Sequence, residues 1–212
     1  MARGSFITLE GGEGAGKSTQ ISRLADALRD AGVAVHTTRE PGGSPGAEDI
    51  RKLLVTGETG RWDAMSEALL HFAARRDHVE KVIMPKLDAG EWVLSDRFAD
   101  STMAYQGYAQ GLGRPAIEAL YQLTLGDFTP DLTLILDLPV EIGLARAAAR
   151  RDGEDRYERL GADFHRSLRD AFRDIAKRAP QRCEVIDAAG DLGEVQAALR
   201  AAVARRLGLQ LS

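Results

Sequence analysis

Short apolar runs recur along the chain, with segments of helical periodicity between them. The runs cover residues 6–9, 33–37, 92–95, 132–138 and 183–186. They do not alternate strictly between apolar and polar residues, which is typical of strands buried on both faces of a parallel sheet. The pattern therefore predicts a five-stranded parallel sheet.

Helices are expected between the strands. Apolar stripes at helical spacing run from Ile21 to Leu28, before Gly32 as a stop signal, and from Leu192 to Leu207. Residues 66–83 predict another helix, with Phe72 and Leu69 facing the core. Strands that alternate with helices imply right-handed crossovers and a doubly wound α/β fold. Such sheets bind ligands at the carboxyl ends of their strands.

Composition narrows the class of protein. The chain has 212 residues, of which 44% are apolar and 28% charged, so we expect one domain over residues 1–212. A net charge of −4 argues against nucleic-acid and membrane-surface partners. A strand beginning near residue 5 leaves no room for a signal peptide, so a cytoplasmic location is expected. The single cysteine, Cys183, is interpreted as a core residue.

A phosphate-binding loop follows the first predicted strand. Residues 11–18 read G-G-E-G-A-G-K-S, which matches G-x-x-x-x-G-K-[ST] between a strand and a helix. Backbone N–H groups curl around phosphate oxygens there, and glycines leave room for them. Lys17 is expected to reach the β- and γ-phosphates of ATP, and Ser18 to ligate Mg²⁺. The predicted nucleotide-binding residues are Gly11, Gly12, Glu13, Gly14, Ala15, Gly16, Lys17, Ser18 and Thr19.

Other classes of P-loop protein fit the sequence less well. A GTPase would need a guanine-reading N-K-x-D motif, which is absent, and the D-x-x-G at residues 187–190 follows the last strand. A helicase or transporter ATPase would be larger. Small size and scattered arginines favour a kinase of small molecules.

The ends of two other strands carry candidate acceptor-side residues. Asp96 and Arg97 follow the run at 92–95, where a carboxylate can hold water on Mg²⁺ or accept a proton and a neighbouring arginine can bridge a transferring phosphoryl group. A structural ion pair is the alternative. Arg39 follows the second strand and Arg51 starts the next helical segment. Each either binds a monophosphate or is a surface charge.

Further candidates share helix faces or clusters. His71, Arg75 and His78 lie on one face of the helix expected at 66–83. The hydroxyls of Ser101, Thr102 and Tyr105 are candidates for reading a base or sugar. The arginine-rich segment at 146–159 is by itself most simply a solvated helix face.

In order along the chain, these motifs resemble those of bacterial thymidylate kinases. The matching segments are residues 11–18, 38–43, 73–75, 96–98, 101–107, 131–137 and 146–158. The resemblance implies the P-loop nucleotide kinase fold, transfer of the ATP γ-phosphoryl group to dTMP, ATP and Mg²⁺ as cofactors, and a homodimer. The rival predictions are a kinase for another nucleoside monophosphate and a regulatory module that binds ATP without turnover.

The resemblance also implies residue roles. Arg75 hydrogen-bonds the thymine edge with Thr102 beside it, and Tyr105 crowds the sugar 2′ position. The candidates for binding the dTMP phosphate are Arg39, Arg51 and Arg97. Glu10 is expected to lie near the metal. The predicted substrate-binding residues are Glu10, Arg39, Arg51, His71, Phe72, Arg75, Arg97, Ser101, Thr102, Tyr105 and Gln106, and the predicted metal ligands are Ser18 and Asp96.

Two positions distinguish this chain within the resemblance. One branch of the family has an arginine in the P-loop at the position of Gly14, and its absence implies that the 146–159 segment is a lid that supplies catalytic arginines. The predicted catalytic residues are therefore Lys17, Arg97, Arg150 and Arg151. The family usually has phenylalanine at the position of His71, where the ring stacks on thymine. His71 and Phe72 are both candidates for that contact, and an imidazole near Arg75 is expected to be neutral.

We predict that Arg150→Ala or Arg151→Ala lowers kcat far more than it weakens dTMP binding. Arginines that stabilise phosphoryl-transfer charge are worth about 10³–10⁵ in rate and act mainly in the transition state. Steady-state kinetics combined with calorimetric titration of dTMP separates the two effects. A double variant with wild-type kcat would show that the segment is a solvated helix face.

Overall fold

Strands and helices alternate along the computed structural model, which describes residues 3–149 and 156–211. The strands are β1 Phe6–Glu10, β2 Val35–Arg39, β3 Trp92–Asp96, β4 Leu132–Asp137 and β5 Cys183–Asp187. The helices are α1 Lys17–Asp30, α2 Pro45–Val55, α3 Ala64–His78, α4 Met84–Asp88, α5 Ala99–Thr102, α6 Arg114–Leu125, α7 Val140–Ala148, α8 Ala162–Arg178 and α9 Leu192–Leu207. Two π-helical segments, η1 Val79–Ile83 and η2 Met103–Ala109, join α3 to α4 and extend α5.

The strands form one parallel sheet in the order β2-β3-β1-β4-β5. The chain starts in the middle strand, moves to one edge and then crosses to the other. This doubly wound arrangement confirms the predicted fold class. β1 and β3 are therefore neighbours, although more than eighty residues separate them.

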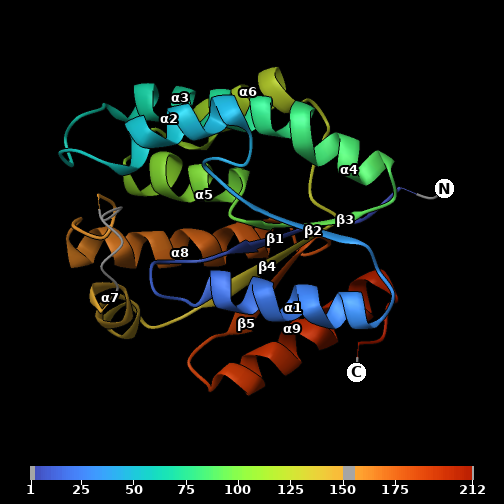
Figure 1. The fold of residues 1–212 in the computed structure, drawn as a ribbon. Helices are drawn as coiled ribbons and strands as arrows, with labels where there is room; N and C mark the ends of the chain where they lie inside the picture. The colour runs from blue at the N-terminus through green and yellow to red at the C-terminus, as the bar shows by residue number, and fades with distance from the viewer. Residues whose placement is uncertain (1–2, 150–155, 212) are drawn as a thin grey trace.

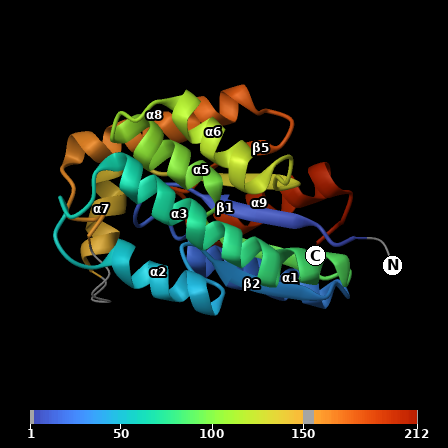
Figure 2. The ribbon, with the colours of Figure 1, turned by 90° about the horizontal axis from the view of Figure 1, so that it is seen from above.

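Helices cover both faces of the sheet (Figure 1). α1 and α9 pack on one face, and α3, α5, α6 and α8 lie over the other, as the view from above also shows (Figure 2). Successive strand residues face opposite cores: Val93 belongs to the core under α3 and α8, and Leu94 to the core under α1 and α9. Burial on both faces explains why the strands read as continuous apolar runs.

Some element boundaries and orientations differ from those predicted. β2 ends at Arg39, so Arg39 is part of the strand, and Arg51 lies inside α2 instead of starting it. Phe72 is buried as expected, but Leu69 is 50% exposed, so its assignment to the core was wrong. These two residues are three apart, and the core-facing stripe of α3 includes Ala68 and Phe72. Cys183 is buried, which confirms it as a core residue.

The carboxyl ends of the central strands converge on one edge of the sheet. The loop after β1 leads into α1, β2 ends at Arg39, and β3 ends at Asp96, which is paired with Arg39 in register. Residues from three separate parts of the sequence therefore meet where ligands bind in such sheets.

Candidate active site

The loop between β1 and α1 approaches a neighbouring helix too closely for any side chain at Gly14. Gly14 has φ +68°, and a Cβ there would lie 2.0 Å from the carbonyl oxygen of Gly143 in α7. The converse holds as well, because a Cβ on Gly143 would lie 2.5 Å from the carbonyl oxygen of Glu13. An arginine at position 14 would therefore displace α7. The loop of this chain therefore has no room for the arginine that the other branch of the resembling family carries at this position.

Lys17 lies across the mouth of this loop. Its Nζ donates to the carbonyl oxygens of Gly11 at 3.1 Å and Gly12 at 2.9 Å. Burial lowers the pKa of Lys17 to about 8, and the positive charge of Arg97 acts in the same direction. The ammonium group is thus held at the loop, where phosphate oxygens bind.

Ser18, in the first turn of α1, lies beside Asp96 at the carboxyl end of β3. The Ser18 hydroxyl donates to Asp96 Oδ2 at 2.6 Å. Mg²⁺ in kinases keeps several waters and takes one or two protein oxygens besides the phosphates. A hydroxyl and a carboxylate fit that chemistry. No cluster of three or more His, Cys, Asp or Glu side chains suited to a metal occurs among residues 3–149 and 156–211, so the described part of the chain offers no all-protein metal cage.

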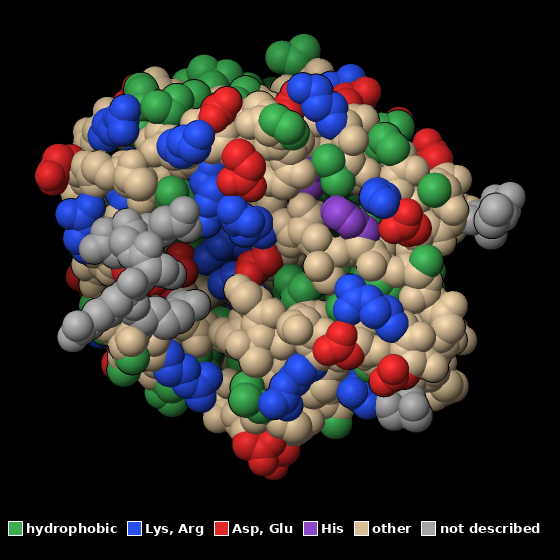
Figure 3. Space-filling model, in the orientation of Figure 1, with side chains coloured by type: hydrophobic (Ala, Val, Ile, Leu, Met, Phe, Trp, Pro, Cys, Tyr) green, Lys and Arg blue, Asp and Glu red, His purple; other side chains and the backbone are tan. Residues whose placement is uncertain are grey.

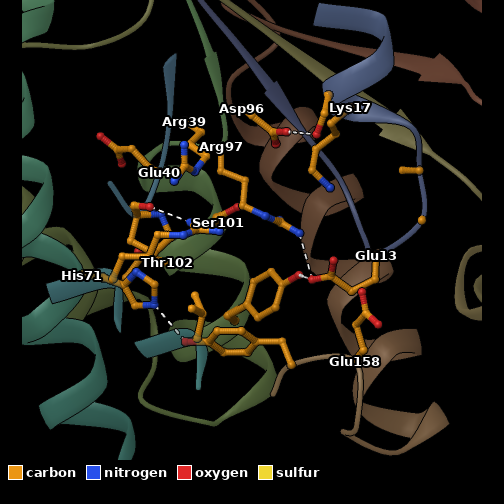
Figure 4. A pocket seen from close by; sticks show the side chains of 18 of the residues that line it. Glu13, Lys17, Arg39, Glu40, His71, Asp96, Arg97, Ser101, Thr102 and Glu158 are labelled. Carbon is orange, nitrogen blue, oxygen red and sulfur yellow. Dashed lines mark hydrogen bonds and ion pairs between the residues drawn. The ribbon is translucent and has the colours of Figure 1, made fainter. Parts of the chain in front are cut away.

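Arg97 links the phosphate loop to the turn after β3. It has φ +70° and is the only non-glycine with positive φ among the described residues. Its guanidinium donates to the Gly11 carbonyl and the Ser101 hydroxyl, both at 3.0 Å, and to Glu13 Oε1 at 2.9 Å. The Tyr105 hydroxyl donates to the same Glu13 oxygen at 2.6 Å. These bonds aim Arg97 into the cavity (Figure 4).

Glu13 remains a carboxylate despite its burial. Burial alone would raise its pKa, but the charges of Arg97 and Lys17 and the Tyr105 hydroxyl outweigh burial and lower the pKa to about 2. Glu13 is therefore the anion that holds the Arg97 guanidinium in place.

Glu10 is bonded to the turn after β3. It is fully buried at the end of β1, where its two oxygens accept hydrogen bonds from the Phe98 amide at 2.7 Å and the Ser101 hydroxyl at 2.6 Å. It is absent from the cavity lining. Glu10 therefore shapes the turn that carries Arg97, and its place near the metal stays a prediction.

Arg75 is buried behind Glu40 and Thr102, which line the cavity at the end away from the phosphate loop, and it has a spare donor. Its Nε donates to Glu40 Oε2 at 2.7 Å, and its Nη2 to the Phe98 carbonyl and the Thr102 hydroxyl, both at 3.1 Å. Its Nη1 is buried and has no hydrogen-bond partner in the described part of the chain. Leaving a charged donor unpaired costs free energy that a ligand acceptor would recover.

Phe72 lies beneath Arg75 and does not line the cavity. The guanidinium carbon of Arg75 is 4.9 Å from the Phe72 ring centroid and 5.3 Å from that of Phe98. Phe72 is 1% exposed and packs in the core. Of the two candidate rings, only His71 lines the cavity, because a shift of one helix position rotates a side chain by about 100°.

His71 is held as a neutral ring at the cavity wall. Burial lowers its pKa to about 3, with further contributions from the positive charges of Arg75 and Arg97. This confirms the expectation that the imidazole is uncharged. Its Nε2 lies 3.0 Å from the Tyr157 hydroxyl.

One cavity joins both ends of the site, and Lys and Arg side chains gather in this hollow (Figure 3). Figure 4 shows Lys17 and Glu13 on one side, His71 and Thr102 on the other, and Arg97 between them. The predicted residues that line it are Glu13, Gly14, Ala15, Gly16, Lys17, Ser18, Arg39, Arg51, His71, Asp96, Arg97, Ser101, Thr102, Tyr105 and Gln106.

The remaining predicted residues, among them Arg75, Phe72 and Glu10, lie outside that lining. Gly11 and Gly12 face a smaller cavity behind the loop, beside α7 and α8, and Thr19 is exposed on α1. Arg150 and Arg151 lie outside the described residues. Arg156, in the same arginine-rich segment, is 2% exposed, so a solvated helix face does not describe this end of the segment.

Sequence reasoning assigned no site role to five residues that line the cavity, namely Glu40, Pro41, Val55, Tyr157 and Glu158. Glu40 holds Arg75, and Tyr157 contacts His71. Glu40 belongs to the motif at 38–43, where only Arg39 was assigned a role. Tyr157 directly follows Arg156 in a segment interpreted through its charges alone, so its aromatic ring was the overlooked signal.

A cavity with a phosphate loop at one end and a buried donor behind the wall at the other is typical of P-loop kinases of small nucleotides. The family model for thymidylate kinase matches residues 9–199 of this chain. The chain therefore belongs to the thymidylate kinase family.

Relatives agree with this placement. A thymidylate kinase from Caulobacter vibrioides is 57% identical over 99% of this chain and 100% of its own length. One from Rhodopseudomonas palustris strain TIE-1 is 56% identical over 97% of this chain and 90% of its own. The crystal structure of thymidylate kinase from Ehrlichia chaffeensis superposes with a TM-score of 0.76 at 37% identity and covers 95% of this chain and 99% of that one. Across the described residues, helices are too short or too polar to cross a bilayer.

We predict that Glu10→Gln changes how stability depends on pH. Burial and the Asp100 charge raise the pKa of Glu10 from 4.5 to about 7. The folded state then binds this proton more tightly than the unfolded state, so the wild type loses stability as pH rises from about 4.5 to 7. Glutamine has no proton to lose, and the variant should gain about 1–3 kcal/mol relative to wild type between pH 5 and 8.

Urea unfolding at intervals across that pH range measures the difference. Glu118→Gln, at an exposed carboxylate of α6, is the matched control and should follow the wild-type profile. Parallel profiles for Glu10→Gln and the wild type would contradict the assignment.

Proposed function

We infer that this chain transfers the γ-phosphoryl group of ATP to dTMP and releases ADP and dTDP. The observation that supports the choice of acceptor is the Nη1 of Arg75, which has no partner among the described residues and is buried behind the cavity wall formed by Glu40 and Thr102. Such a donor suits a base that offers a carbonyl oxygen. Membership of the thymidylate kinase family supports the same acceptor.

The donor side is assigned to the phosphate loop. Its backbone amides and the N-terminus of α1 attract the ATP phosphates, and Lys17 has only to leave the Gly11 and Gly12 carbonyls to meet them. Mg²⁺ would be held through Ser18 and Asp96, where it supplies positive charge to the phosphate oxygens.

Arginines are assigned to the acceptor phosphate. Arg97 is held by Glu13 and the Gly11 carbonyl, and it lies between the two ends of the cavity. Arg39 and Arg51 line the same cavity nearer α2. Forked guanidinium donors match phosphate oxygens, and a side chain already held in position loses little entropy on binding. Because Arg97 lies between the two ends of the cavity, we assign it to the transferring phosphoryl group as well as to the acceptor phosphate.

Base and sugar are assigned to the opposite wall. Arg75 donates to the thymine carbonyl with Thr102 beside it, and the neutral His71 ring packs on the base. Tyr105 lines the cavity with its hydroxyl fixed on Glu13, so its ring crowds the space that a ribose 2′-hydroxyl would need.

We also propose that residues 1–212 form one kinase domain, that residues 146–159 act as its lid, and that the protein works in the cytoplasm. The closed loop at Gly14 supports the lid, because catalytic arginines must then come from elsewhere. The arginines concerned are Arg150 and Arg151.

A homodimer formed through α3 and α6 is a further part of the proposal. These helices pack together, and they carry the exposed apolar side chains Leu123 at 83%, Leu69 at 50% and Met65 at 39%. Apolar side chains gather along the corresponding upper edge in Figure 3. A patch of this kind favours burial against a second copy of the chain.

We predict that kcat/KM for dTMP exceeds that for dCMP by at least tenfold. Cytosine presents an amino group where thymine presents a carbonyl, and leaving the Arg75 donor unpaired costs about 1–3 kcal/mol. A coupled assay of ADP release measures both substrates. Arg75→Met should narrow the ratio to below about threefold, whereas Arg76→Met, at the exposed neighbour, should preserve it. Equal kcat/KM for the two substrates in the wild type would refute the assignment of dTMP.

We predict that Leu123→Glu converts the protein from dimer to monomer. A charge at the centre of an apolar interface loses hydration without gaining a partner. Sedimentation velocity reports the molar mass, and the matched control is Leu192→Glu, at an exposed leucine of α9 on the other side of the sheet. A monomeric wild type would rule out the homodimer.

A further inference from the structure

Glu67 is a buried carboxylate with no role in the chemistry described above. It lies in α3, one helical turn before His71, and is 0% exposed. Its Oε1 accepts from Gln106 Nε2 at 2.7 Å, Gln110 Nε2 at 3.2 Å and the Tyr157 hydroxyl at 2.7 Å. A buried anion with this many donors fixes the position of everything bonded to it.

Arg156 balances the charge of Glu67 and ties a third segment to the pair. Its Nη2 lies 2.6 Å from Glu67 Oε2, and its nitrogens also donate to the carbonyl oxygens of Leu54, Glu58 and Thr59. The end of α2 and the loop before α3 are thereby joined to Tyr157. Removing one partner of such a pair leaves an uncompensated buried charge, so the arrangement is rigid.

The Tyr157 hydroxyl transmits this order to His71. A carboxylate only accepts, so the hydroxyl proton points to Glu67 Oε1. Burial and the Glu67 charge raise the pKa of Tyr157 well above its usual range, which keeps that proton in place. The phenol oxygen is left to accept from His71 Nε2, 3.0 Å away. A neutral imidazole with its proton on Nε2 then has a bare Nδ1.

We propose that Glu67 and Tyr157 are positioning residues that fix the tautomer and ring orientation of His71 at the base wall of the cavity. An imidazole has two polar nitrogens, and in a cavity wall a free N–H would meet the base as an unpaired donor. The hydrogen bond to Tyr157 satisfies that donor and stops the ring from turning over. A phenylalanine at position 71 would have no such donor to satisfy. The proposal rests on dTMP as the ligand of this cavity.

The decisive experiment is a double-mutant cycle on dTMP affinity, measured by calorimetry with His71→Phe and Tyr157→Phe. Tyr157→Phe should weaken dTMP binding about threefold to tenfold when His71 is present. In the His71→Phe background the same change should alter affinity by less than about 1.5-fold, because no imidazole remains to be held. The matched control is Tyr108→Phe, which removes a hydroxyl bonded to Asp174 away from the cavity; it should leave affinity unchanged.

A second measurement needs no substrate. Nitrogen-15 spectra of the ligand-free protein should show His71 with a protonated Nε2 and a bare Nδ1, and Tyr157→Phe and Glu67→Gln should each remove that selection. Tyr108→Phe should keep it. These spectra test the hydrogen-bond chain even in a protein that binds no dTMP, which separates failure of this proposal from failure of the proposed function.

Two results would overturn the proposal. One is an equal loss of affinity from Tyr157→Phe in both backgrounds, which would mean that Tyr157 acts on the ligand or the fold directly. The other is a wild-type His71 with its proton on Nδ1.

Discussion

The hydrogen bonds from the Phe98 amide and the Ser101 hydroxyl to Glu10 hold the two halves of this site together. Glu10 ends β1, just before the phosphate loop, and its acceptors fold the turn after β3 back against that loop. Arg97 directly follows β3 and precedes both donors, so these bonds keep it at positive φ. Its guanidinium donates to the Gly11 carbonyl. Strain of this kind persists only where the surroundings over-determine it. The parallel pairing of β1 with β3 supplies those surroundings.

The cations of the cavity are each restrained by acceptors of the protein itself. Lys17 is held by loop carbonyls, Arg97 by Glu13 and Arg75 by Glu40. Long cationic side chains lose rotamer entropy when a ligand orders them, and here much of that cost is met by folding. One nitrogen of Arg75, Nη1, has no hydrogen-bond partner in the described part of the chain. Cations held in position attract phosphate groups at little cost in entropy. The open donor of Arg75 favours ligands that offer it an acceptor.

The sequence correctly predicted the features that depend on residues close together along the chain. Lys17 and Ser18 follow from a local motif, because a strand, a glycine loop and a helix place them with little help from elsewhere. The sheet followed from apolar runs that are buried on both faces. Errors arose where a residue can face two ways. Leu69 was placed in the core although it faces outwards, and the bonds of Glu10 to the turn after β3 were not foreseen.

By itself the sequence determined the fold class, the phosphate loop and the family, since each is written in local patterns or in motifs of fixed order. Only the tertiary structure decided which of two adjacent rings lines the cavity, because Phe72 packs against Arg75 in the core and His71 is left at the cavity wall. It alone brought Glu67 and Tyr157 together, ninety positions apart. Hydrogen bonds between distant segments depend on distance and direction in space, and neither is encoded in spacing along the chain.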